Sequence, residues 1–492
     1  MSSLDVDVLI VGAGISGIGA AHHLAEQRPE RSFMILESQD GFGGTWRTHR
    51  YPGIRSDSDL YTFGYRFKPW VGPPIATGEQ IMAYLDEVVA GDRLSDRVLF
   101  GHRVVGAEWS SDEQRWSVRA VRGADGATVE VNAAFLWMCQ GYYRHEEGYT
   151  PTWPGMERFT GRIVHPQTWP EDLEYAGRRV VVIGSGATAA TLVPALSPHC
   201  AHVTMLQRSP TFFIARDNAN DVADMLRLLE IPEEWIHEIV RRKILFDMEL
   251  LYQVARDYPD FAREELLRPI RELLGDRIDV DRHFNPRYRP WQQRIAALPG
   301  GDLFHEIDQG RVSVVTDEID SFVDEGIRLA SGEVLECDLI VTATGFDVSV
   351  LGDVDFRVDG AAVDFSETVT YRGMMFTGVP NMVWVFGYFR NSWTLRVDLI
   401  GDFVCRLLGH LDELGAASAT PVLPAGLDAM PRLDWMDPEN FNPGYLARSM
   451  RRLPRQGDRD PWRHTQDYWT EKVDLPAADL DDGALVYDKR RA

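Results

Sequence analysis

The chain has 492 residues, of which 44% are hydrophobic, and a net charge of -24. A single hydrophobic core stops growing at ~250–300 residues, so two or three domains are expected. The acidic balance argues against nucleic-acid binding, because contacts to phosphates need clustered Lys and Arg.

Cysteine use and hydropathy argue against a disulfide scaffold and against a membrane span. The four cysteines are far apart and form no CxxC pair, so neither a disulfide framework nor a dithiol redox centre is expected. No signal peptide is visible, and no apolar run reaches the ~18 residues of a membrane helix. We expect a soluble cytoplasmic protein without a metal centre.

The first forty residues carry a dinucleotide-binding fingerprint. Val6 to Val11 is a continuous apolar run suited to a buried parallel strand, and Gly12, Gly14 and Gly17 then form GxGxxG ahead of a helix. The next strand, SFMILE, ends at Glu37, about twenty residues on. The glycines permit close approach to pyrophosphate, and the acid binds a ribose hydroxyl.

A long loop, GFGGTWRTHRYPGIRSDSDLYTFGYRF, follows this fingerprint. Loops of this length in compact domains are usually functional. The alternative for its aromatic residues is packing in a satellite core. Its candidate cofactor contacts are Gly44, Thr45, Trp46, Asp57 and Tyr61.

Between this loop and residue 140, the pattern predicts one helix and several strands. Residues 78–90 form an amphipathic helix, and residues 97–131 form a small antiparallel sheet with a turn at Gly123 to Gly126. The stretch AAFLWMCQG then returns as a buried strand to the first sheet.

A second nucleotide unit follows the stretch FTGRIVHPQTWP, residues 159–170, which is a candidate hinge between two dinucleotide sites. Residues 179–183 form a strand and lead into GxGxxA at the start of a helix. The next strand ends at Arg208, where the first unit has Glu37. Arginine suits the 2′-phosphate of NADPH, whereas an acid suits NAD or FAD; a solvated Arg is the alternative. The candidate contacts are Gly184, Gly186, Ala187, Thr188, Arg208 and Ser209.

The remainder contains a helical lobe, the end of the second sheet and a return to the first domain. The lobe spans residues 221–281, with Met and Phe stripes predicted as core. VSVVT, SFVDEGIRLASG and CDLIVTATGF are predicted to complete the second sheet as strands and a hairpin. NMVWVFGYF is predicted as a strand and residues 392–415 as a long helix. The tail after Asp434 either wraps the body or is partly mobile.

The predicted fold is therefore α/β, with two Rossmann-like dinucleotide-binding domains, the first for NAD or FAD and the second for NADPH, and a helical insertion in the NADPH domain. The predicted segments are 1–147 (first dinucleotide-binding domain, first part), 148–216 (linker and NADPH domain, first part), 217–289 (helical insertion), 290–345 (NADPH domain, second part) and 346–492 (first dinucleotide-binding domain, second part, and tail).

At this point the residues carry a family resemblance. The stretch 159–170 matches FxGxxxHxxxWP, the fingerprint of Baeyer–Villiger monooxygenases within the class B flavoprotein monooxygenases. The loop RYPGIRSDSDLYTFGYRF and the segment NPxxxPWxQR look most like the ethionamide-activating subgroup. The matching residues of the fingerprint are Phe159, Gly161, His165, Trp169 and Pro170.

The resemblance implies a mechanism. The first dinucleotide-binding domain, residues 1–147 and 346–492, then binds FAD, which NADPH reduces. O₂ adds to the flavin C4a carbon, and the resulting peroxide attacks a ketone to give an ester or lactone. Asp57 matches the active-site Asp of the family and Arg294 its active-site Arg. A permanent guanidinium can stabilise the developing oxyanion, and Asp57 can hold it by a charge-assisted, bidentate pair. His165 is expected to position the linker and the cofactor.

One departure bears on cofactor choice. Close relatives carry Lys immediately before the active-site Arg, where it helps to hold the 2′-phosphate, and here that residue is Gln293. Arg208 keeps one cationic contact, so NADPH remains the expected reductant. Three other functions stay open: oxygenation of a sulfide or amine on the same scaffold, an NADPH oxidase or flavin reductase, and a nucleotide-sensing regulator.

Overall fold

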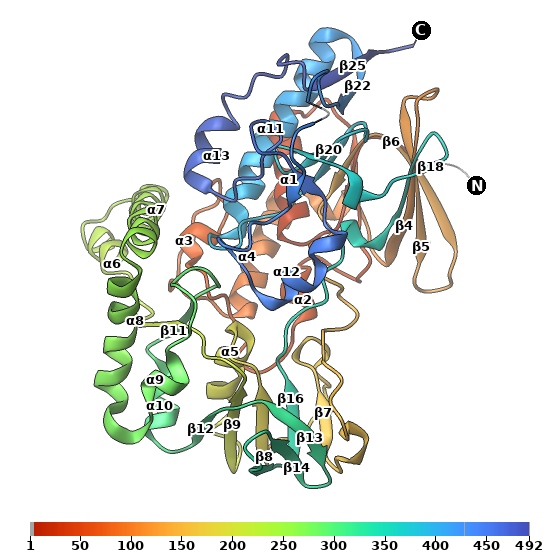
Figure 1. The fold of residues 1–492 in the computed structure, drawn as a ribbon. Coiled ribbons are helices and arrows are strands. Elements are labelled where there is room, and N and C mark those ends of the chain that lie inside the picture. The colour runs from red at the N-terminus through yellow and green to blue at the C-terminus, as the bar shows by residue number, and fades with distance from the viewer. Residues whose placement is uncertain (1–3, 428, 492) are drawn as a thin grey trace.

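The structure, a computed structural model, describes residues 4–427 and 429–491. Two main sheets dominate it, one in the upper and one in the lower half of Figure 1, and a helical lobe lies at the left. Each sheet is built around parallel strands with helices between them, in agreement with the predicted α/β class. No helix in the described residues combines the length and apolar character needed to cross a bilayer.

The first sheet has nine strands in the order β18-β17-β4-β5-β6-β1-β2-β3, with β21 also paired to β6. Its central strand β1 lies between the parallel partners β2 and β6, which explains the continuous apolar run. The strands are β1 (Leu4–Val11), β2 (Phe33–Leu36), β3 (Val98–Leu99), β4 (His102–Ser110), β5 (Arg115–Arg122), β6 (Thr128–Met138), β17 (Asp355–Val358), β18 (Ala361–Ala362) and β21 (Met382–Trp384).

The prediction of a separate small antiparallel sheet is wrong. ATVEVNA and AAFLWM form one strand, β6, which pairs antiparallel with β5 and parallel with β1. The only polar residue at the predicted break is Asn132, and it stays extended with its side chain donating to Asp5 at 3.2 Å. The strand β21 is also shorter than the predicted strand NMVWVFGYF. After Trp384 only the amide of Val385 donates to β6, to Met138 O, and β6 itself ends at that residue.

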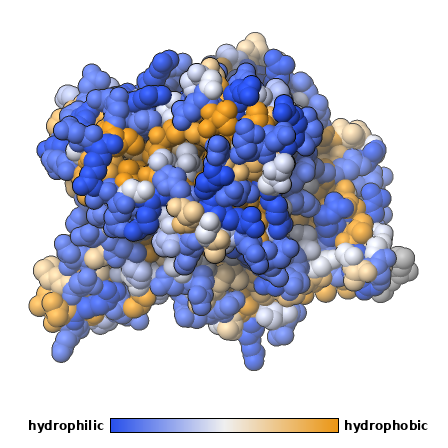
Figure 2. Space-filling view, turned by 90° about the horizontal axis from the view of Figure 1, so that it is seen from below, coloured by the Kyte–Doolittle hydropathy of each residue, from blue (hydrophilic) through white to orange (hydrophobic). Residues whose placement is uncertain are grey.

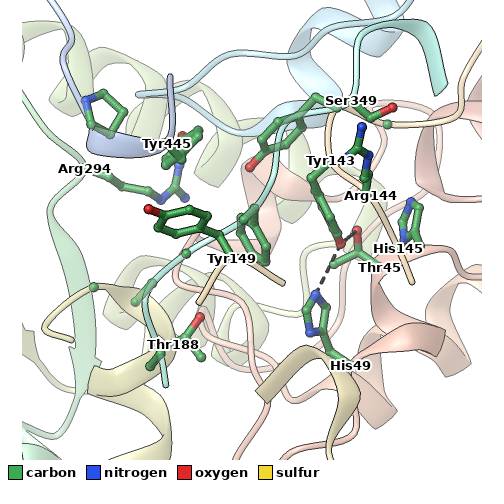
Figure 3. A pocket seen from close by; sticks show the side chains of 18 of the residues that line it. Thr45, His49, Tyr143, Arg144, His145, Tyr149, Thr188, Arg294, Ser349 and Tyr445 are labelled. Carbon is green, nitrogen blue, oxygen red and sulfur yellow. Dashed lines mark hydrogen bonds between the residues drawn. The ribbon is translucent and has the colours of Figure 1, made fainter. Parts of the chain in front are cut away.

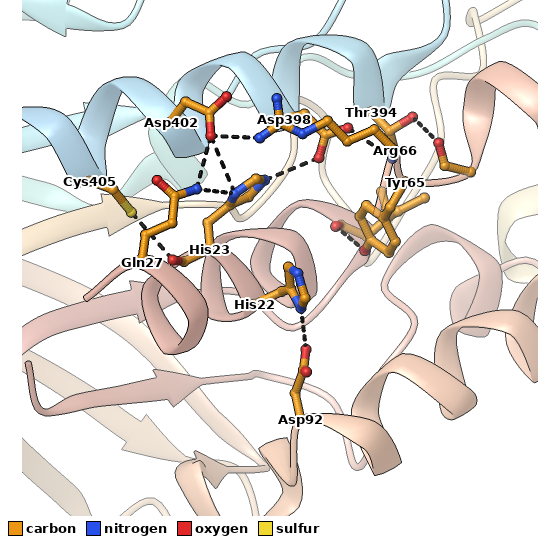
Figure 4. Close-up of polar contacts among 12 residues, drawn as sticks. His22, His23, Gln27, Tyr65, Arg66, Asp92, Thr394, Asp398, Asp402 and Cys405 are labelled. Carbon is orange, nitrogen blue, oxygen red and sulfur yellow. Dashed lines mark hydrogen bonds and ion pairs between the residues drawn. The ribbon is translucent and has the colours of Figure 1, made fainter. Parts of the chain in front are cut away.

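Two helices from opposite ends of the chain cover this sheet, α1 (Ile15–Gln27) and α11 (Trp393–Leu414). A polar cluster joins them (Figure 4): His23 Nε2 contacts Asp398 Oδ1 at 3.1 Å in its buried part, and Gln27 donates to Asp402 Oδ1 at 2.9 Å at its exposed edge. Close approach of the helices depends on Gly401, because an added Cβ there would overlap the His23 imidazole.

The Gly401→Val variant is expected to lower the free energy of unfolding by about 1–3 kcal/mol, because the added methyl groups overpack this contact. Gly91→Val is the matched control: Gly91 also lies in a helix, α4, but an added Cβ meets no atom within 4 Å. Urea unfolding of the purified proteins measures both effects. Equal stabilities of the two variants would contradict the close packing of α1 on α11.

The second sheet has five parallel strands in the order β12-β9-β8-β16-β7. Short apolar strands buried on both faces fit this parallel arrangement. The helix α5 (Ala187–Leu196) follows the strand that leads into the second Gly-rich turn. The strands are β7 (Arg162–Val164), β8 (Arg179–Ile183), β9 (His202–Gln207), β12 (Val312–Thr316) and β16 (Leu339–Thr342).

The predicted hairpin does not complete this sheet. It forms a separate three-stranded antiparallel sheet of β13 (Ile319–Val323), β14 (Gly326–Leu329) and β15 (Val334–Glu336). The reason is that β12 and β16 are parallel, so the chain between them must cross over a face of the sheet. The hairpin makes that crossover, and its Phe322 and Ile327 pack with Val181 of β8.

The helical lobe consists of α6 (Asp221–Leu228), α7 (Glu233–Asp257), α8 (Pro259–Leu274) and α9 (Val280–Phe284). It packs on both halves of the molecule: Ile236 and Val240 of α7 join the core under the first sheet, and Leu267 and Ile270 of α8 join the core of the second. The lobe therefore bridges the two sheets at the left of Figure 1.

The prediction that the Met and Phe stripes of the lobe form core is wrong. Met225, Phe246 and Phe261 are 53%, 67% and 60% exposed, because smaller and β-branched residues occupy the inner faces of the helices. Figure 2 keeps the lobe on the left, and apolar side chains gather on that side of the face it shows.

His237 of α7 ties the lobe to the first half of the chain, because its Nδ1 accepts from the amide of Trp70 at 3.2 Å. Burial, with help from Arg241, lowers the pKa of this imidazole to about 4. The folded state therefore prefers neutral His237, and the stability gained from it is complete above pH ~6.5 and is lost as the pH falls toward 4.

Between pH 7 and pH 4 the loss from this one group is expected to be on the order of 3 kcal/mol. Urea unfolding of His237→Gln should show a shallower fall over that range than the wild type, because Gln does not titrate. His199→Gln, at an exposed position, is the control. A His237→Gln profile parallel to the wild type would contradict the assignment.

The tail wraps the body. Its Glu471 accepts from Arg396 Nε of α11 at 2.8 Å and from Tyr388 OH at 2.6 Å, in a buried cluster. The other elements are α2 (Thr45–Thr48), α3 (Leu60–Phe63), α4 (Gly78–Gly91), α10 (Asp302–Asp308), α12 (Gly444–Ser449), α13 (Tyr468–Asp474), β10 (Phe213–Arg216), β11 (Ala296–Pro299), β19 (Thr370–Tyr371), β20 (Met375–Phe376), β22 (Ala416–Pro421), β23 (Leu433–Asp434), β24 (Arg455–Gln456) and β25 (Leu485–Lys489).

Candidate active site

A cavity of about 1210 Å³ opens at the carboxyl ends of the parallel strands of both sheets. Gly12 after β1 and Glu37 after β2 line it from the first sheet, and Gly184 after β8 and Arg208 after β9 line it from the second. Parallel α/β sheets bind ligands outside the carboxyl ends of their strands. Both predicted nucleotide-binding turns thus line the same cavity.

The first turn has the shape that a pyrophosphate needs. Gly12 has a φ of +101°, and an added Cβ would lie 2.7 Å from Cys139 O, so a larger residue is excluded. Gly14 lies against Gly44, and Gly17 packs beneath the turn on Gly12 rather than lining the cavity. Helix α1 begins at Ile15 without a side-chain cap, so its first amides are open to an anion.

Glu37 lies at the edge of this turn and is buried. Its carboxylate accepts from the amides of Ala13 and Gln39, each at 2.7 Å, and it lines the cavity. This position suits a ribose hydroxyl of the first dinucleotide.

The long loop also contributes residues to the cavity lining, among them the predicted contacts Gly44, Thr45 and Trp46. Thr45 Oγ1 lies 2.7 Å from the hydroxyl of Tyr143, which His49 Nε2 also contacts at 3.2 Å (Figure 3). Burial lowers the pKa of His49 to about 4, so its imidazole is neutral near pH 7. The loop is thereby fixed by uncharged hydrogen bonds.

The second turn repeats the arrangement. Gly184 has a φ of +131°, and α5 begins just after Gly186 without a side-chain cap. An added Cβ on Gly186 would meet nothing within 4 Å, which leaves open space above the turn for a phosphate. The further residues that line this part of the cavity, as predicted for the second dinucleotide, are Ala187, Thr188, Arg208 and Ser209.

Asp57 and Arg294, which are 237 positions apart, meet in the cavity wall. Arg294 Nε donates to Asp57 Oδ2 and Nη2 to Oδ1, both at 2.6 Å, so the expected bidentate contact is present. Nη2 also donates to Ser58 Oγ at 2.7 Å, and Nη1 to Phe389 O at 2.8 Å. These bonds use four of the five N–H groups, which leaves one on Nη1 to donate to a ligand.

The charge of Arg294 is secure at any working pH. Burial on its own would lower the pKa of the guanidinium, but the adjacent Asp57 carboxylate outweighs it and raises the pKa above its ordinary value. Two tyrosines share this region with Arg294, Tyr142 and Tyr445, and Figure 3 shows Tyr445 beside the guanidinium. Burial raises the pKa of both hydroxyls, so they stay protonated and can donate.

Tyr61 was predicted to contact a cofactor, and the structure places it elsewhere. Its side chain is fully buried, its hydroxyl accepts from Arg227 of α6 at 3.1 Å, and it does not line the cavity. This position agrees with core packing, the alternative given for the aromatic residues of the loop. The reason is that residues 60–63 form the short helix α3, which turns Tyr61 toward the lobe.

His165, like Gly17 and Tyr61 a predicted contact outside the cavity lining, holds the linker. Its Nδ1 accepts from the amide of Gln167 at 3.1 Å, so Nε2 carries the proton and donates to Gly345 O at 3.2 Å. Burial lowers its pKa. The stretch around it is not a free loop, since residues 162–164 form the edge strand β7. Both imidazole nitrogens are occupied, in keeping with a structural role.

Sequence reasoning missed Tyr142, Tyr445 and Arg448 as residues of the cavity. Tyr142 comes four residues after the carboxyl end of β6, a position at which ligand contacts are common, so a signal was available. Tyr445 and Arg448 lie on α12, in a tail whose sequence has no periodicity, and nothing in the sequence pointed to them.

Comparisons with known proteins agree with this geometry. A family model described as "NAD(P)-binding Rossmann-like domain" matches residues 10–87, and one described as "Flavin-binding monooxygenase-like" matches residues 73–248. The chain is 44% identical over 488 residues to "FAD-containing monooxygenase EthA" of Mycolicibacterium smegmatis, covering 99% of this chain and 98% of that protein. It is 42% identical to "Putative FAD-containing monooxygenase MymA" of Mycobacterium tuberculosis, over 98% of this chain and 97% of that one.

Solved structures share the fold. "Oxidized steroid monooxygenase bound to NADP" superposes with a TM-score of 0.76 at 23% identity, covering 99% of this chain and all of that one. The cyclohexanone monooxygenase from Rhodococcus sp. Phi1 bound to NADP+ superposes with a TM-score of 0.69 at 22% identity, over 86% and 87% of the two chains.

Proposed function

The chain belongs to the family of FAD-containing monooxygenases, and from that premise we propose that it is an NADPH- and O₂-dependent Baeyer–Villiger monooxygenase converting ketones to esters or lactones. The observation that carries the proposal is the bidentate Arg294–Asp57 pair in the wall of a cavity that both nucleotide-binding turns also line.

The residues present fit both cofactors. FAD suits the first turn, where the buried Glu37 takes the ribose and the uncapped α1 amides take the pyrophosphate. NADPH suits the second turn, where the exposed Arg208 takes the 2′-phosphate and the amides of α5 take the pyrophosphate. The relatives named as FAD-containing and the structures named as bound to NADP support this pairing.

FAD, when bound and reduced by NADPH, supplies the activation of O₂. The chain supplies the charge that oxygen transfer to a ketone requires. Arg294 holds a permanent positive charge and keeps one N–H free to donate to the developing oxyanion. Asp57 and Ser58 fix the orientation of the guanidinium, so no reorganisation is needed when the charge develops.

The test is product analysis under ¹⁸O₂. The FAD-loaded protein is supplied with NADPH and with linear, cyclic and aryl ketones, and esters are sought by mass spectrometry; an anaerobic reaction is the control. We expect esters that carry one ¹⁸O atom. Sulfide substrates run in parallel: labelled sulfoxide without any ester would make the protein a sulfur oxygenase, and hydrogen peroxide alone would make it an oxidase.

A further inference from the structure

Several arginines line the cavity, and they differ in whether they form an ion pair with a carboxylate. Arg55, Arg144 and Arg294 lie in ion pairs with Asp302, Asp347 and Asp57. Arg103, Arg208 and Arg448 also line the cavity, yet within residues 4–427 and 429–491 none of them forms an ion pair with a carboxylate. Arg103 belongs to β4 of the first sheet, whereas Arg208 and Arg448 are exposed and lie on the side of the second turn.

Arg448 is fixed in place although it lacks an acidic partner. Its guanidinium carbon lies 3.6 Å from the centroid of the Tyr149 ring, and Nη2 donates to Phe346 O at 3.3 Å. The side chain is exposed on one side only, and its partial burial is the main cause of its lowered pKa; the like charge of Arg208 adds to it. Two cations held near each other in this way favour an anion between them.

The segment before α12 is tethered to the residues around Gln293. The amide of Asn442 donates to Gln292 O at 3.1 Å, Gln293 Nε2 donates to Asn442 Oδ1 at 3.2 Å, and Arg289 donates to Glu439 O at 3.0 Å. Gln293 stands where close relatives are expected to have a cationic Lys. Its amide thus anchors the segment that carries Arg448 into the cavity.

We propose that Arg448 of the C-terminal tail, together with Arg208, binds the 2′-phosphate of NADPH, and that Gln293 serves this site as a tether. The guanidinium fork matches phosphate, and a doubly charged phosphate suits two such groups. The inference rests on the proposed function only for its reductant and does not involve the ketone.

The experiment is isothermal titration of the oxidised, FAD-loaded protein with NADP⁺ and with NAD⁺, without ketone. A hydrogen bond to a charged group contributes about 1.5–3 kcal/mol, so Arg448→Ala should weaken NADP⁺ binding by about 10- to 150-fold. NAD⁺ binding should change less than about 2-fold, because NAD⁺ lacks the phosphate. Arg451→Ala, an exposed arginine three residues on, is the matched control and should change neither.

Two further variants sharpen the result. Arg448→Lys keeps the charge and should retain most of the preference for NADP⁺. Gln293→Lys added to Arg448→Ala should restore NADP⁺ binding by returning a cation to the same phosphate. Unchanged NADP⁺ binding in Arg448→Ala, or an equal loss for both nucleotides, would overturn the proposal. A protein that oxidised no ketone would still show this preference, so the two failures are distinguishable.

Discussion

Arg294→Ala is expected to lose ester formation by a factor of about 10²–10³ while flavin reduction by NADPH continues at a near-normal rate. The reason is that the guanidinium acts on the oxyanion formed during oxygen transfer and not on hydride transfer. Anaerobic stopped-flow bleaching of the flavin measures the first half-reaction, and labelled ester measures the second. Arg294→Lys, which keeps the charge but not the planar fork, should form ester at a rate between those of the wild type and Arg294→Ala.

Arg287→Ala is the matched control, since Arg287 is exposed in the same segment. It should behave as the wild type in both measurements. Ester formed by Arg294→Ala at the normal rate would remove Arg294 from the mechanism, and an equal loss of flavin reduction would make its role structural.

Much of the fold was predictable because the decisive residues are local. Each dinucleotide-binding motif consists of a strand, a turn and a helix that follow one another in the sequence. Gly12, Gly184 and Arg208 could therefore be placed from their spacing alone. The contact between Asp57 and Arg294 spans 237 positions, and no periodicity reports on such a pair. It was predictable only through the family resemblance.

The errors arose where tertiary packing overrides a local pattern. The inner faces of α6–α8 use Ala223, Ile236 and Val240, so the larger Met and Phe residues remain outside, and the apolar pattern alone cannot show which side faces the core. The pattern likewise cannot tell a hairpin that joins a sheet from one that crosses over it. The role of α12 depends on hydrogen bonds to the segment at 289–293, which leave no trace in its own sequence.

Asp57→Asn is expected to slow ester formation by about 10², because Asp57 works through Arg294 by fixing the angle of the guanidinium. An Asn side chain offers one acceptor oxygen in place of two and turns an amide N–H toward the N–H groups of Arg294, so the bidentate contact at 2.6 Å cannot form. Ser58→Ala, which removes one bond from the same Nη2 to a neutral acceptor, should cost far less.

The decisive measurement is the double variant. If Asp57 acts only through Arg294, then Asp57→Asn combined with Arg294→Ala should be no slower than Arg294→Ala alone, since residues that act as a unit have non-additive effects. Rates of labelled ester formation in the three variants complete the cycle. Multiplicative losses would mean that Asp57 has a separate role, such as contact with the cofactor, and would require a different account of this pair.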